Sequence, residues 1–153
     1  MPASYAHYRF GKLLLPTLPA DVRQTIQRFR RMYDMGLQGP DFFFYYNPFL
    51  HTATGELGSI FHRQTGREFF QRVCRVARLE KSEAAQAYIC GVLCHYALDS
   101  VLSPLIREKA SELEQPPYFI CQRMEQLRLP YGVDWVACCL DSLNYITDPE
   151  LCR

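Results

Sequence analysis

The stretch AAQAYICGVLCHYALDSVL, residues 84–102, is largely apolar and has the length of a buried helix. It also contains His95 and Asp99, which are four positions apart and therefore face the same side of a helix. Burying an imidazole and a carboxylate costs free energy unless each finds a partner. Two interpretations of this pair are open: a hydrogen-bonded pair in the core, or two ligands of one metal ion.

The segments around this stretch also read as helices. Proline, glycine and helix-capping residues separate these segments from one another. No segment shows the sustained period-two alternation of a strand. We expect residues 36–58 to form an aromatic-rich loop and Ser103-Pro104 to break or kink the central helix. The sequence therefore predicts one all-α domain over residues 1–153, a compact bundle of five to six helices at 3–15, 20–36, 59–78, 82–102, 118–128 and 134–146.

Length and charge narrow the classes of function. A chain of 153 residues is long enough for one real core, and its formal net charge of +1 gives no basic footprint for nucleic acid. No signal peptide is evident at the N-terminus, and the apolar stretch 84–98 is shorter than the ~20 residues of a bilayer span. We expect a cytoplasmic protein with reduced cysteines, no transmembrane segment and no nucleic-acid partner.

Three further polar residues accompany the His95/Asp99 pair. His7 and His62 lie in predicted helices beside large apolar residues, and the turn Gly39-Pro40-Asp41 presents a carboxylate at the edge of the aromatic loop. Taken singly, each has an ordinary explanation as a core histidine or a turn aspartate. Together they form a mixed nitrogen and oxygen set from several helices, which is how helical bundles commonly build metal sites.

Four segments in this order carry a resemblance to a known family. They are SYAHYRFG (4–11), LQGPDFFFYY (37–46), the helix of His62, and LCHYALDS (93–100). Over roughly residues 2 to 125 the chain resembles the zinc-dependent phospholipase C family, and more closely its short bacterial branch without a secretion signal. The resemblance implies an all-α fold, like that of the similar single-strand nucleases, and a zinc cluster that hydrolyses phosphodiesters.

The resemblance also implies roles for individual residues. Asp41, His62, His95 and Asp99 would hold one zinc, Asp99 would bridge to a second metal, and His7 would bind that second metal. For the third metal the family uses histidines where this chain has Ser103 and Cys121, whereas Glu125 matches the pattern. Serine is a poor zinc ligand, whereas a cysteine thiolate is a good one. We therefore expect one or two zinc ions, with Cys121 and Glu125 as remaining candidates for a third site.

Two main functions follow from these expectations, and a single-strand nuclease is a third option that the near-neutral charge disfavours. The first is a zinc-dependent phosphodiester hydrolase in which Asp41 orients or deprotonates the attacking water and the substrate is a phosphoester-containing small molecule or a lipid head group. The second is a family member that has lost catalysis and acts as a binding protein, with or without a stabilising metal. Four protein ligands on one zinc form a closed, structural site, so catalysis requires that Asp99 or Asp41 be shared. The substrate, the activity and the oligomeric state stay open.

Overall fold

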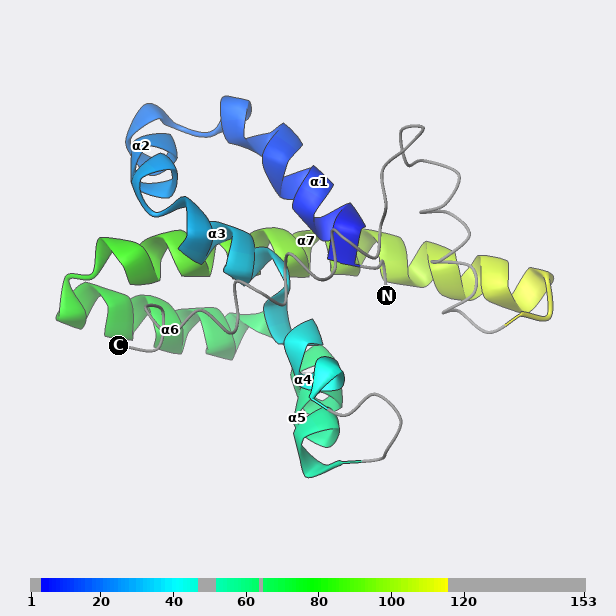
Figure 1. The fold of residues 1–153 in the computed structure, drawn as a ribbon. Helices are drawn as coiled ribbons and strands as arrows, with labels where there is room; N and C mark the ends of the chain where they lie inside the picture. The colour runs from blue at the N-terminus through cyan, green and yellow to red at the C-terminus, as the bar shows by residue number, and fades with distance from the viewer. Residues whose placement is uncertain (1–3, 47–51, 64, 116–153) are drawn as a thin grey trace.

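Helices form all the regular structure of the described residues. The computed structural model describes residues 4–46, 52–63 and 65–115, and no strand occurs among them. The all-α class predicted from the sequence is confirmed. Short 3-10 turns occupy Leu15–Thr17 and Gly39–Asp41. The seven helices (Figure 1) are α1 (Ser4–Leu14), α2 (Ala20–Arg28), α3 (Arg30–Leu37), α4 (Phe42–Tyr45), α5 (Ala53–Arg63), α6 (Gly66–Glu80) and α7 (Glu83–Glu112).

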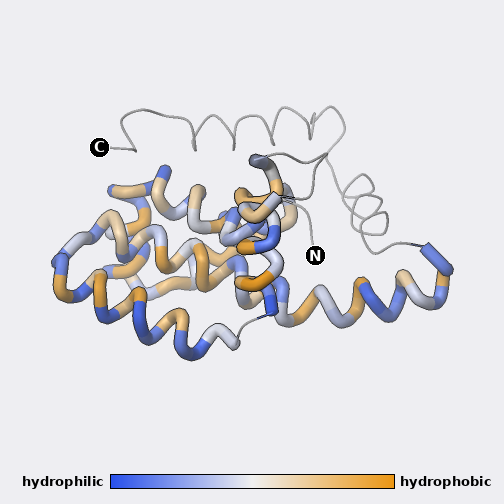
Figure 2. Tube along the Cα trace, turned by 90° about the horizontal axis from the view of Figure 1, so that it is seen from below, coloured by the Kyte–Doolittle hydropathy of each residue, from blue (hydrophilic) through white to orange (hydrophobic). Residues whose placement is uncertain are grey.

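Helix α7 is the axis of the fold. Helices α1, α2 and α3 pack along it, α6 runs beside its first half, and α4 packs on α5 (Figure 1). Both views show the last turns of α7 extending beyond the other described helices (Figures 1 and 2). The helix starts at a true cap, because the Ser82 side chain accepts a hydrogen bond from the Ala85 N–H at 3.1 Å.

The main core lies where α1, α2 and α3 meet the first half of α7. Its centre is formed by the fully buried side chains Ile26, Tyr33, Leu37 and Ala87. The Tyr33 hydroxyl donates to the Gly11 carbonyl at 3.0 Å and lies 3.4 Å from the Cys94 sulfur, so the polar tip of this tyrosine is satisfied inside the core. This core fixes α1 and α3 on the face of α7 that carries His95.

Two glycines allow α3 and α7 to cross at backbone contact. A Cβ on Gly36 would overlap the Tyr88 carbonyl, and a Cβ on Gly91 would overlap the Tyr33 carbonyl. Only residues without a side chain permit this approach. The crossing lies one turn before His95, so it also sets how near the segment after α3 comes to that histidine.

Helix boundaries differ from the expected ones in three places. The helix expected over 20–36 is divided at Phe29, which leaves helical geometry with φ −115° and ψ 46° and thereby lets both halves bury apolar residues. The loop expected over 36–58 contains α4 and the start of α5. The helix expected over 59–78 is likewise two helices, α5 and α6, because Gly66 begins a new helix after the extended Thr65.

Pro104 does not end α7. The helix continues for two further turns to Glu112, although proline cannot give the Ser100 carbonyl its usual N–H partner. Helix α7 is consequently long and apolar enough, by length and composition alone, to cross a membrane, a test that core helices of soluble proteins also pass. The helices expected at 118–128 and 134–146 lie outside the described residues.

Candidate metal centre

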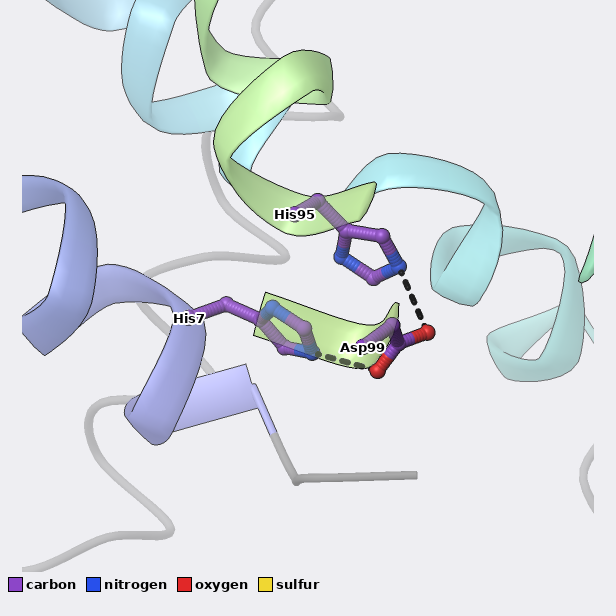
Figure 3. Close-up of side chains that lie close together, drawn as sticks. All are labelled: His7, His95 and Asp99. Atoms are coloured by element: carbon purple, nitrogen blue, oxygen red, sulfur yellow. Dashed lines mark ion pairs between the residues drawn. The ribbon is translucent and has the colours of Figure 1, made fainter. Parts of the chain in front are cut away.

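His95 and Asp99 lie close together but make no short hydrogen bond. The Nε2 atom of His95 lies 3.5 Å from Oδ2 of Asp99, which is longer than an N–H···O hydrogen bond (Figure 3). The other ring nitrogen, Nδ1, lies 3.0 Å from the Leu37 carbonyl oxygen. A carbonyl only accepts, so Nδ1 carries a proton and Nε2 is the ring nitrogen that faces the carboxylate. Either a proton on Nε2 or a metal ion between the two groups would make this contact favourable.

His62 repeats this arrangement from another helix. Its Nδ1 donates to the Gly58 carbonyl at 2.7 Å, one turn earlier on α5, and its Nε2 lies 3.0 Å from Oδ1 of Asp41 and 3.6 Å from Oδ2 of Asp99. Backbone carbonyls thus orient both imidazoles through Nδ1. Metal-binding histidines are usually held in this way.

Asp41 reaches the centre through the turn that follows α3. Gly39 has φ +52°, and a Cβ there would lie 2.5 Å from the His95 ring, so glycine is needed both for the turn and for the contact. The turn brings Asp41, which is only 6% exposed, against His62. The Gly-Pro-Asp motif therefore acts by placing a carboxylate beside two imidazoles.

Three of the separations among these ligand atoms approach those of a tetrahedral zinc site, although Asp41 and Asp99 fall in different groups of mutually close ligand atoms. Zinc bonds of about 2.0–2.1 Å put neighbouring ligands of a tetrahedron about 3.3 Å apart. The three separations among Asp41 Oδ1, His62 Nε2, His95 Nε2 and Asp99 Oδ2 given above are 3.0, 3.6 and 3.5 Å. The ligand atoms of Asp41, His62 and His95 also lie within 4.8 Å of one another.

His7 approaches the same carboxylate from its other side. Its Nε2 lies 3.6 Å from Oδ1 of Asp99, whereas Oδ2 faces His62 and His95 (Figure 3). The His7 ring is fully buried and stacks on that of His95 with centroids 3.9 Å apart. His7, His95 and Asp99 form a second group whose ligand atoms lie within 4.8 Å of one another. Asp99 is thus placed between two sets of imidazoles, as a bridging carboxylate would be.

Several buried polar atoms of the centre lack a well-directed hydrogen bond. Nε2 of His62, Nε2 of His95 and Oδ1 of Asp41 are buried and make no well-directed hydrogen bond among the described residues, although His62 Nε2 and Asp41 Oδ1 lie within ion-pair distance of each other. Such orphaned atoms are rare in proteins and each needs an explanation. Several of them converging on one point are best explained by an ion that binds them all.

Burial and the neighbouring charges act in opposite directions on the titration of the centre. Burial would raise the pKa of Asp99, but the histidines His95, His7 and His62 outweigh it and hold that pKa below its usual range. Burial would also lower the pKa of His62, yet the interactions with Asp41, the Gly58 carbonyl and Asp99 outweigh it and raise that pKa. The residues thus favour a buried positive charge between the carboxylates, which protons supply when no metal is bound.

Other predicted site residues fall elsewhere. Cys121 and Glu125 lie outside the described residues. Ser103 lies on the wall of a cavity beside the centre. Cys94 adjoins His95 in sequence, but its sulfur lies in the core next to the Tyr33 hydroxyl, and burial raises the pKa of its thiol. Cys94 is therefore a core residue and no ligand.

A cavity of about 660 Å³ opens beside the metal centre. His62, His95 and Asp99 reach its wall, and the predicted aromatic run contributes to its apolar lining. The aromatic residues that line it are Phe42, Phe43, Phe44, Phe61, Phe69, Phe70, Tyr88 and Tyr96. Arg63 and Arg107 line it as well, and sequence reasoning missed both. One available signal was the four-residue spacing of His95, Asp99, Ser103 and Arg107, which places them on one stripe of a continuous helix.

No protein-family model, curated protein or solved structure matches the chain.

Proposed function

We propose that this protein is a metal-dependent phosphodiester hydrolase that uses zinc. The observation that carries the proposal is the position of Asp99, whose two oxygens face different imidazoles at 3.5–3.6 Å. A carboxylate shared in this way would hold a second metal that has fewer protein ligands among the described residues than a closed site has, and therefore room for water or substrate.

Each side chain has a separate task in this proposal. Bound zinc would supply a water of lowered pKa and positive charge for the phosphoryl oxygens. Asp41, held beside His62, orients that water and accepts its proton. The backbone carbonyls of Leu37 and Gly58 hold His95 and His62 in the tautomer that binds metal. The aromatic wall of the cavity excludes bulk solvent and thereby strengthens these electrostatic interactions.

The other candidate is a metal-stabilised binding protein. It is favoured by the number of candidate ligands on one side of Asp99, because Asp41, His62, His95 and Asp99 together would supply the four ligands of a closed zinc site. A closed site stabilises a fold without turning over a substrate, because its ligands converge only in the folded chain.

Metal stoichiometry and hydrolysis together separate the two functions. Elemental analysis of protein purified without added metal or chelator should give about two zinc equivalents, and hydrolysis of bis(p-nitrophenyl) phosphate should depend on them. Asp99→Asn should bind less metal and lose hydrolysis, and Asp41→Asn should lose hydrolysis. Glu80→Gln, an exposed carboxylate at the end of α6, is the matched control and should retain both.

The result of this experiment is decisive in either direction. One zinc equivalent with no hydrolysis would establish the structural site. Wild-type metal content in both His95→Ala and Asp99→Ala would overturn the ligand assignment itself.

A further inference from the structure

Two arginines give the cavity beside the metal centre an unusual charge pattern. Arg63 ends α5 directly after His62, and Arg107 lies two turns beyond Asp99 on α7. Among the described residues neither arginine forms an ion pair, whereas Arg28, Arg30 and Arg72 each pair with a carboxylate. Asp99 is also the only carboxylate among the described residues that line the cavity. The cavity wall therefore carries more positive than negative charge even before a metal binds.

Arg107 is turned back toward the metal centre. Its Nε donates to the Ser103 carbonyl at 3.3 Å, one turn nearer to Asp99. At about 1.5 Å of rise per residue, this places the guanidinium group roughly 6 to 10 Å along α7 from Asp99. The outer nitrogens of the guanidinium make no hydrogen bond with the described residues, so its planar fork is available for a carboxylate or phosphate.

Aromatic side chains line the same cavity as the two arginines. Phe43 stacks on Phe61 with centroids 5.7 Å apart, and Tyr96 meets Phe70 edge to face at 5.6 Å. All four rings line the cavity. A ligand in the cavity therefore has the candidate metal centre, apolar rings and a guanidinium group within the same lining.

We infer that the cavity binds a phosphoester that carries a second anionic group, with an apolar or aromatic body between the ester phosphate and that group. The phosphate lies at the metal centre and the second anion lies against Arg107, with Arg63 beside the phosphate end. A cationic head group is disfavoured, because its positive charge meets the guanidinium groups and the described lining offers no carboxylate other than Asp99, which belongs to the metal centre. This inference rests on the proposed function only in placing the phosphate at the metal centre.

Binding calorimetry on the zinc-loaded protein tests the inference without requiring turnover. The probes are phenyl phosphate, 4-carboxyphenyl phosphate, phenylene 1,4-bisphosphate and phosphocholine. The two probes with a second anionic group, 4-carboxyphenyl phosphate and phenylene 1,4-bisphosphate, should bind about tenfold more tightly than phenyl phosphate. One additional charge-assisted hydrogen-bonded pair would give a difference of this size. Phosphocholine should bind more weakly than phenyl phosphate. The stronger of the two doubly anionic probes identifies whether the second group is a carboxylate or a phosphate.

Variants show whether the arginines cause the preference. Arg107→Gln should bring the affinity ratio of 4-carboxyphenyl phosphate to phenyl phosphate close to one and leave phenyl phosphate binding unchanged. Arg63→Gln should lower the affinity of the protein for all the phosphate probes. Arg72→Gln, an exposed arginine of α6 outside the cavity, is the matched control and should change nothing. Both test arginines are exposed, so the variants should fold.

Hydrolysis of bis(p-nitrophenyl) phosphate by the same preparations separates this inference from the proposed function. If the protein keeps the affinity ratio of 4-carboxyphenyl phosphate to phenyl phosphate but does not hydrolyse the diester, the proposed hydrolase function is wrong and the ligand with two anionic groups is supported. Equal affinities for all probes, a ratio that survives Arg107→Gln, or no binding at all would overturn the inference, whether or not hydrolysis occurs.

Discussion

Replacing Gly91 by alanine should damage both the fold and the metal centre. The added Cβ would lie 2.8 Å from the Cα of Gly36, whereas carbon atoms pack at about 3.5–4.0 Å, so α3 and α7 must part by roughly 1 Å. Overpacking of this kind costs about 1–3 kcal/mol. For a chain of this size that corresponds to a loss of roughly 2–12 °C in the melting temperature of the metal-free protein, measured by circular dichroism.

The same displacement should weaken zinc binding. Because Asp41 follows α3 and His95 lies on α7, a 1 Å separation exceeds the roughly 0.2 Å tolerance of a metal–ligand bond. We expect zinc affinity to fall about tenfold or more in a competition titration with a chromophoric chelator. Gly55→Ala is the matched control: a Cβ there makes only an ordinary contact at 3.5 Å with Thr52, and helical alanine should raise stability by about 0.5–1 kcal/mol. Unchanged stability and zinc affinity in Gly91→Ala would refute the close-crossing argument.

Three further predictions concern the metal-free protein and the start of α7. Because the folded-state pKa of His62 is raised, its contribution to the stability of the metal-free fold is complete below about pH 6.5 and is lost as the pH rises through the raised value. Zinc affinity should rise over the same interval, since binding displaces that proton; titration calorimetry in buffers of different ionisation enthalpy should detect proton release, and its absence would contradict the assignment. Because the pKa of Asp99 is lowered in the fold, its contribution is present above about pH 3.9 and is lost as the pH falls through the lower folded value. Acid unfolding followed by circular dichroism should therefore be less steep in Asp99→Asn, and an identical profile would show that Asp99 is not coupled to the histidines. Ser82→Ala removes the cap of α7 and should cost about 1 kcal/mol in urea unfolding, with Ser100→Ala, whose exposed hydroxyl bonds only within the helix, losing less.

Local rules predicted the parts of this protein that depend on neighbours in sequence. Helical periodicity gave the all-α class, and the spacing of His95 and Asp99 gave a pair on one face of α7. The start of a helix at Ser82 was also predicted. These features depend on fixed dihedral geometry within a few residues, so no knowledge of distant contacts was needed.

The remaining features depend on contacts between distant segments. Phe29 interrupts a helix without glycine or proline, because its two halves pack separately against α7. Pro104 is tolerated inside α7 although the local rule made it a boundary. The arginines of the cavity were missed for a related reason: Arg107 joins the stripe of His95 only if α7 continues past Pro104, and nothing local places Arg63 beside that stripe.

The arrangement of α5 has a consequence for the lifetime of a bound ion. Helix α5 packs on α4 and on the turn Gly39–Asp41, while His95 and Asp99 are anchored in the long α7. His62 is therefore the ligand whose helix has the least direct contact with the fold's axis. A rocking motion of α4 and α5 about Gly39 would withdraw His62 and Asp41 together and leave the ion on His95 and Asp99 alone. If such a motion occurs, the rate at which bound metal exchanges with solvent would report how often α4 and α5 move away from α7.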